Sequence, residues 1–189
     1  HKTGTTWLQK NVFPYLKVHY FKKPDLIKIS LKEGINLISD EELSVGPHRY
    51  RDINKRYIVI DSIKKLFPDA RIIICKREKK SWINSLYKQY IKYGGDLSKV
   101  EFLQKTNEGF FDVEKYIDYL NKSFKQVYVC SFEELCKNNE IFVKKICSFI
   151  VIDPKKYELQ KRNVALNKKQ LNLLRFINKF FSTDKKNGM

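Results

Sequence analysis

LFPDARIIICKREKKSWINSLYKQY, residues 66–90, contains the signals of a buried strand and of the helix that follows it. The run from Ala70 to Cys75 is apolar and β-branched apart from Arg71, and it follows a Pro-Asp turn. Such runs are typical of strands that are covered on both faces. Lys76 and Arg77 come next, so the strand is predicted to present basic groups at its carboxyl end.

The helix after this strand is indicated by apolar residues at helical spacing and by the glycine pair Gly94-Gly95 that stops it. Its predicted stripe consists of Trp82, Leu86, Tyr90 and Tyr93.

Strands and helices are predicted to alternate along the rest of the chain. Further helices are expected at 5–14, 53–67, 97–105, 113–124, 140–150 and 168–181, and further strands at 35–38 and 126–130. This alternation predicts an α/β fold with a central parallel sheet covered on both faces. Ligands of such folds gather at the carboxyl ends of the strands.

The chain opens with Lys2-Thr3-Gly4-Thr5-Thr6-Trp7 directly before a predicted helix. Glycine gives close access to the backbone, hydroxyls donate hydrogen bonds, and free N–H groups at a helix start favour anions. The motif therefore predicts a phosphate-binding loop, although an ordinary threonine-capped helix would also fit. It differs from the Walker loop, because the lysine precedes the only glycine of the motif.

Length and composition favour one domain over residues 1–189, since 42% hydrophobic and 14% aromatic residues supply a sizeable core. The longest apolar stretches fall short of the roughly 20 residues that a membrane helix needs. His1 leads straight into the motif without an initiator Met or a preceding apolar strand, so we expect an N-terminal truncation that removes the first strand.

The formal charge of +17 would attract nucleotides, nucleic acid, anionic lipid or acidic glycans alike, and does not choose among them. The cysteines have neither a C-x-x-C pair nor histidines at metal spacing, so we expect reduced core thiols and a cytoplasmic setting. They are Cys75, Cys130, Cys136 and Cys147.

A second anion-binding element is predicted where Arg77 ends its strand and Ser85 follows eight residues later on the next helix. A guanidinium and a hydroxyl about two turns away could hold a second phosphate. An ion pair between Arg77 and Glu78 is the plainer alternative.

Together the two elements resemble the PAPS-dependent sulfotransferase family, whose 5′-phosphosulfate loop reads much like PKSGTTW and whose 3′-phosphate site pairs an Arg with a Ser eight residues later. The similarity extends through residues 66–90 and SFEEL to the tail helices, and looks closest to bacterial members. It implies a three-layer, P-loop-like α/β fold. It also implies a transferase that moves a sulfuryl group from PAPS to a hydroxyl or amine, releases PAP, and requires no metal.

The resemblance assigns roles to residues at the matching positions. Lys2 would lie by the bridging oxygen of the phosphosulfate and act as the catalytic cation. Trp7 and Phe132 would lie near the adenine, although Trp7 could equally pack the first helix. The other nucleotide-binding residues implied are Thr3, Gly4, Thr5, Thr6, Arg77, Ser85, Lys161 and Arg162. Asn163 departs from the family's Arg-Lys-Gly pattern beside the last two.

The catalytic base is expected among the carboxylates that follow the strand at 35–38. Glu41 is the predicted base, because Ser39 and Glu41 resemble an S-x-E pattern of bacterial relatives. Asp40 and Glu42 remain rivals, and His19 and His48 are less well placed.

Two other function classes remain open. A P-loop-type nucleotide kinase or NTPase would need Mg²⁺ and an acidic strand end, for which Asp40 is available. A nucleic-acid-binding protein without chemistry is suggested by charge and by the Lys and Tyr residues at 87–93. For the sulfotransferase, a carbohydrate or glycolipid acceptor is expected, and no nucleic-acid partner.

Overall fold

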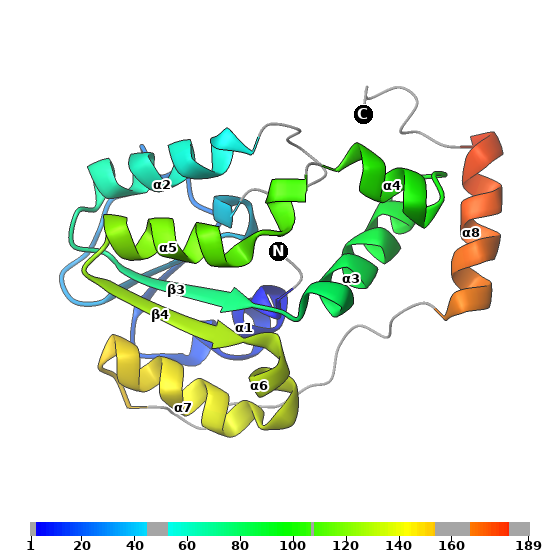
Figure 1. The fold of residues 1–189 in the computed structure, drawn as a ribbon. Coiled ribbons are helices and arrows are strands. Elements are labelled where there is room, and N and C mark those ends of the chain that lie inside the picture. The colour runs from blue at the N-terminus through cyan, green and yellow to red at the C-terminus, as the bar shows by residue number, and fades with distance from the viewer. Residues whose placement is uncertain (1–2, 45–52, 107, 154–166, 182–189) are drawn as a thin grey trace.

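The computed structural model describes residues 3–44, 53–106, 108–153 and 167–181. Helices and strands alternate along these ranges, as predicted (Figure 1). The helices described are α1 (Thr5–Asn11), α2 (Asn54–Leu66), α3 (Lys79–Lys92), α4 (Lys99–Lys105), α5 (Val113–Ser123), α6 (Phe132–Lys137), α7 (Asn139–Ile150) and α8 (Lys168–Phe181), with the 3-10 helices η1 (Phe13–Tyr15), η2 (Glu41–Ser44) and η3 (Glu108–Phe111). The strands described are β1 (His19–Lys22), β2 (Asn36–Ser39), β3 (Arg71–Lys76) and β4 (Gln126–Ser131).

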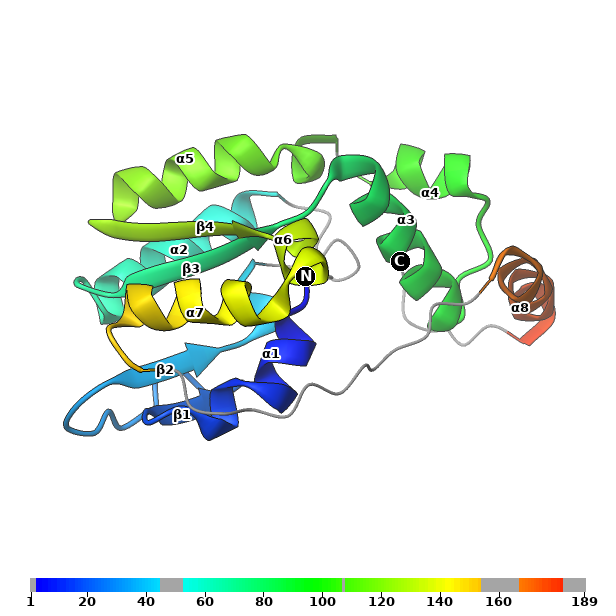
Figure 2. The same cartoon turned by 90° about the horizontal axis from the view of Figure 1, so that it is seen from below.

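The strands form two parallel pairs. β1 pairs with β2 from His19↔Asn36 to Lys22↔Ser39, and β3 pairs with β4 from Arg71↔Gln126 to Lys76↔Ser131. The arrows of β2, β3 and β4 point toward the side of the molecule where α1 begins (Figure 2). The sequence predicts one central sheet, whereas the described strands form two separate sheets of two strands each. Among the described residues, a cavity and not a strand lies between β2 and β3.

Helices cover both faces of the β3–β4 pair (Figure 1). Ile72 and Ile74 pack into a cluster with residues of α2 and α5, whereas Ile73 and Cys75 pack against a cluster built from α1, α6 and α7. Successive strand residues point to opposite faces, so helices pack on both sides of the apolar run, although its residues are half-buried and not fully buried as predicted. This arrangement fixes the carboxyl end of β3 between two layers of helices.

A separate aromatic cluster joins α3, α4, η3 and α8 beyond the end of β3. Trp82, Leu86 and Tyr90 are buried in it as predicted, but Tyr93 is 64% exposed because it lies at the C-cap of α3. The amide of Asn178 donates to the carbonyls of Ile91 and Gly95 at 2.8 Å each, which fastens α8 to α3.

All four cysteines are free thiols, in line with the predicted reduced state. Cys130 and Cys147 are buried and Cys75 is half-buried, but Cys136 is exposed on α6 and does not belong to the core. Burial raises the pKa of the Cys147 thiol, so this side chain stays protonated and behaves as a small apolar group.

Candidate functional site at the carboxyl ends of the strands

The opening loop enters α1 through Gly4, which has a φ of 93°. No side chain caps the helix start, so the threonine-capped alternative does not describe this turn. A Cβ on Gly4 would collide with the Leu135 side chain and would approach Phe132 to 3.5 Å. Both the backbone conformation and the close approach of α6 therefore require glycine here.

Glu41 lies beside the opening loop. The Thr6 hydroxyl donates a hydrogen bond of 2.5 Å to Glu41 Oε1. Glu41 begins η2, directly after β2 and Asp40, and so occupies the carboxyl end of the first strand pair. The contact places the predicted base Glu41 beside the predicted phosphate loop, and its role as base stays a prediction.

Gln9 fastens α1 to the end of β2. This side chain is 3% exposed, and its amide lies 3.2 Å from the carbonyl and 3.1 Å from the hydroxyl of Ser39. Ser39 is itself buried. These two contacts connect the helix that follows the opening loop to the end of β2, directly before the acidic segment 40–42.

Arg77 leaves the end of β3 and turns toward α3 and α6. Its Nε donates to Ser81 Oγ at 2.9 Å, and its guanidinium carbon lies 4.1 Å from the centroid of the Phe132 ring. Partial burial lowers the pKa of Arg77, although it remains far above neutrality and the group stays charged. The predicted partner Ser85 lies one turn further along α3, so Ser81 is the hydroxyl that contacts this guanidinium.

Glu78 does not behave as the simple partner of Arg77. Its carboxylate caps α3 by accepting hydrogen bonds from the backbone N–H groups of Lys80 and Ser81. These bonds lower the pKa of Glu78. The cap fixes the first turn of α3, which carries Ser81.

Phe132 links the two predicted anion-binding elements. The same ring lies under Arg77 and within van der Waals distance of the position that a side chain on Gly4 would occupy. Phe132 is the first residue of α6, and the Ser131 hydroxyl and the Glu134 carboxylate form a capping box that fixes this turn. The opening loop and the end of β3 therefore meet at one aromatic side chain.

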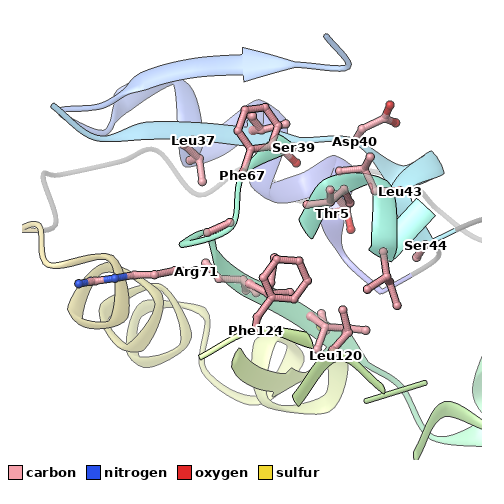
Figure 3. Close-up of a pocket in the computed structure, with 18 of the residues that line it drawn as sticks. Thr5, Leu37, Ser39, Asp40, Leu43, Ser44, Phe67, Arg71, Leu120 and Phe124 are labelled. Atoms are coloured by element: carbon pink, nitrogen blue, oxygen red, sulfur yellow. The ribbon is translucent and has the colours of Figure 1, made fainter. Parts of the chain in front are cut away.

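A cavity of about 930 Å³ opens between the two strand pairs. Its polar lining includes Thr3, Thr5, Glu41, Arg56 and Arg77. The apolar part is lined by Leu37 of β2 and by Phe67, Leu120 and Phe124 (Figure 3).

The orientation of Arg71 separates the two ends of β3. Its guanidinium points away from the cavity in Figure 3 and donates to the carbonyl of Phe149 in α7 at 2.9 Å. Arg77 follows the other end of the same strand. Of these two arginines, Arg77 is therefore the one that faces the candidate site.

A family model for the sulfotransferase domain matches residues 1–185. The chain belongs to the sulfotransferase family. Comparison with curated proteins and with solved structures gave no match. The protein is thus a transferase of sulfuryl groups, and the family generally uses PAPS as its donor.

Some predicted site residues of this sulfotransferase lie outside the described ranges, namely Lys2, Lys161, Arg162 and His48. Trp7 is described, and it packs against the cluster of α1, α6 and α7, which is the packing role considered for it. His19 lies in β1, where its ring nitrogen contacts the Glu33 carbonyl at 3.0 Å.

Three side chains of the site were missed from the sequence. Ser81 could have been found from its spacing, because a residue four positions after a strand-end arginine returns to the same side of the first helical turn. Gln9 and Arg56 give no such signal, since their roles depend on contacts with residues about 30 and 54 positions away.

The described helices and side chains bear on membrane and metal binding. None of the helices in the described ranges is both long and apolar enough to cross a membrane. Within the same ranges, no three His, Cys, Asp or Glu side chains gather in a way that could hold a metal ion. The predicted independence of metal stays a prediction.

Proposed function

We propose that this sulfotransferase takes its sulfuryl group from PAPS and transfers it to a hydroxyl or amine of a carbohydrate or glycolipid. The observation that carries the donor proposal is the position of Phe132, which contacts Arg77 and borders Gly4. An adenine beside this ring would have a glycine loop on one side and a guanidinium on the other. Those are the groups that the two phosphate ends of a bisphosphorylated adenosine require.

The residues fit such a nucleotide in two respects. The start of α1 has no side-chain cap, so backbone N–H groups remain for an anion, and Gly4 lets it approach closely. Arg77 and Ser81 offer a fork and a hydroxyl for the 3′-phosphate, with Ser85 one turn beyond. The remaining assignments, to Lys2, Thr3, Thr5, Thr6, Trp7, Lys161 and Arg162, are carried over from the family's motifs.

Glu41 is the proposed general base. Its carboxylate is at the cavity wall and accepts the Thr6 hydroxyl at one oxygen, which leaves the other oxygen for a proton of the acceptor. Lys2 is the proposed cation that offsets negative charge on the departing oxygen. Asp40 and Glu42 are weaker candidates, since Asp40 accepts from the Glu42 backbone N–H and so caps η2.

A further proposal concerns the fold. One more parallel strand between β2 and β3 would join the two pairs into the central sheet of a three-layer, P-loop-like domain over residues 1–189. Apolar residues of both strands line the space between them, which supports this proposal. A solved structure in which β2 and β3 belong to one sheet would support this proposal, and two separate sheets would contradict it.

The donor proposal is tested by calorimetry with PAP, followed by a screen of carbohydrate acceptors with labelled PAPS. We expect PAP binding and label transfer that persists in the presence of a chelator. Mg²⁺-dependent ATP turnover without PAP binding would favour a kinase instead. Tight nucleic-acid binding without PAP binding would favour the third class. Of the tyrosines at 87–93 that suggested it, Tyr87 and Tyr90 are buried and Tyr93 is exposed.

Reduced thiols also favour a cytoplasmic protein. Fractionation of cells that produce the full chain tests this, and recovery in an oxidising compartment would contradict it.

A further inference from the structure

Arg56, near the start of α2, carries a charge that is almost completely buried. Arg56 is only 4% exposed to solvent. Buried charges in proteins are normally paired with an opposite charge, because removing them from water is costly. The partners of Arg56 are different: its Nε donates to the Ser44 carbonyl at 3.1 Å, and its Nη1 donates to the Phe110 carbonyl at 3.0 Å.

Two aromatic rings lie against the same guanidinium. Its central carbon is 4.4 Å from the centroid of Phe110 and 4.3 Å from that of Tyr116. Cation–π contacts stabilise a charge but supply no counter-ion. Burial lowers the pKa of Arg56. The groups that act on its charge besides burial are Tyr116 and Tyr57, and neither is a carboxylate. Within the described ranges, no carboxylate compensates this cation.

The guanidinium also has hydrogen-bonding capacity left. Arginine carries five N–H donors, and the two bonds to backbone carbonyls use one on Nε and one on Nη1. The two N–H groups of Nη2 are therefore available along one edge. Arg56 lines the large cavity, so a ligand in the cavity can reach the N–H groups along this edge.

The position of Arg56 relates it to the proposed base. Ser44, whose carbonyl accepts from Arg56, donates its hydroxyl to the Glu41 carbonyl at 3.2 Å. Arg56, Ser44 and Glu41 all line the same cavity. A group bound to Arg56 would thus be part of a molecule that also reaches Glu41.

We propose that Arg56 forms an anion subsite in the acceptor pocket, which binds a carboxylate or sulfate group of the sugar that receives the sulfuryl group. This inference rests on the proposed function and narrows its acceptor to an acidic carbohydrate. The incoming anion supplies the missing counter-charge of Arg56, and its binding places a neighbouring hydroxyl beside Glu41. A neutral sugar leaves the buried cation uncompensated and binds more weakly.

The test compares three acceptors of equal length: a uronic-acid oligosaccharide, its carboxyl-reduced counterpart, and the reduced oligosaccharide with a sulfate ester. Wild-type enzyme should show a kcat/KM higher by about tenfold or more for the acidic acceptors, mainly through KM. The better of the two acidic acceptors identifies the preferred anion. Equal values for acidic and neutral acceptors would overturn the proposal.

The variant Arg56→Gln should lose this preference: its kcat/KM for the acidic acceptors should fall by a larger factor than that for the neutral oligosaccharide, so that the ratio between them approaches one. Lys64→Gln is the matched control, because Lys64 lies on the same helix, donates to the Pro68 carbonyl at 2.7 Å and is not itself among the residues that line the cavity. An equal fall for acidic and neutral acceptors in Arg56→Gln would mean that Arg56 only holds η2 in place, and would end the proposal.

Should Arg56→Gln fail to fold, Arg56→Lys keeps the charge and loses the planar fork. We then expect kcat/KM for the acidic acceptors to fall by a larger factor than that for the neutral one, and equal losses would again exclude the subsite.

Calorimetry with the uronic-acid oligosaccharide alone separates this inference from the donor proposal. Binding that depends on Arg56, in a protein that binds no PAP, would retain the anion subsite and refute PAPS as donor. PAP binding and transfer with no dependence on Arg56 would retain PAPS as donor and refute the anion subsite.

Discussion

The guanidinium of Arg77 lies over the ring of Phe132, with its carbon 4.1 Å from the ring centroid. Arg77 follows β3 and Phe132 follows β4, so the contact is made by the ends of two neighbouring parallel strands. The contact therefore orients a strand-end cation toward the opening loop rather than into solvent.

Replacing Arg77 by Ala should weaken PAP binding by about tenfold or more, because a charge-assisted hydrogen bond contributes about 1.5–3 kcal/mol. Calorimetry measures the change. Arg71→Ala is the control, since Arg71 is the first residue of β3, at the end of the strand away from Arg77, and donates to the Phe149 carbonyl. Equal PAP affinities of wild type and Arg77→Ala would remove this arginine from the nucleotide site.

Glu41→Gln should retain PAP affinity and reduce turnover by about 10²–10⁴-fold, the usual contribution of a general base. The amide keeps the size of the side chain and an oxygen that can accept the Thr6 hydroxyl. Single-turnover transfer from labelled PAPS gives the rate. The neighbouring change Glu42→Gln should leave it near the wild-type value, and a larger effect of Glu42→Gln would transfer the role to that residue.

Gly4→Ala and Gly34→Ala form a matched pair, because both glycines have a φ of 93°. The left-handed conformation alone should cost about 1–2 kcal/mol of unfolding free energy in each. Gly4→Ala should cost about 1–3 kcal/mol more, since its Cβ would meet Leu135, whereas nothing lies within 4 Å at Gly34. Denaturant unfolding measures both. Similar losses in the two variants would show that α6 yields easily to the added methyl group.

Acid should destabilise the protein through the carboxylates that cap helices. The pKa of Glu78 is lowered from the ordinary 4.5 by bonds from the Ser81 and Lys80 backbones, and that of Glu134 by bonds from the Ser131 backbone and Lys145. Groups with depressed folded pKa values add stability above the unfolded value of 4.5, and this stability disappears as the pH falls through the folded values. Melting temperatures measured downward from that pH should fall less steeply for Glu78→Gln and Glu134→Gln than for wild type.

The exposed loop residue Glu33 provides the control for this pH series. Glu33→Gln should follow the wild-type curve, and a Glu134→Gln curve that coincides with it would argue against the capping contribution.

Most elements were predictable from local patterns. The run at 70–75 and the stripe of Trp82, Leu86 and Tyr90 became β3 and α3, because burial on both faces and helical spacing leave clear traces in sequence. β1 was missed, since His19–Lys22 has only four residues and its strand state depends on pairing with β2. α6 was also missed, although Ser131 and Glu134 form the S-x-x-E pattern of a helix start.

The candidate site was predictable to a similar degree. Gly4, Glu41, Arg77 and Phe132 come from separate segments, and the parallel connection of strands brings their carboxyl ends together. The contact of Arg77 with Ser81 follows from the spacing of four residues, whereas the predicted role of Ser85 at a phosphate stays a prediction. Arg56 could not be assigned at all, because its buried state results from packing against η3 and α5.

The bond from Thr6 to Glu41 has a kinetic consequence. A hydroxyl carries one proton, so Thr6 can donate to the carboxylate or to a nucleotide phosphate, but not to both. We expect the arrival of the donor to redirect this proton and release Glu41 for the second substrate. The sugar can still bind at Arg56 first, but Glu41 would be free to act only after the nucleotide has bound. Single-turnover transfer should therefore start faster from protein premixed with PAPS than from protein premixed with sugar, and equal initial rates would contradict it.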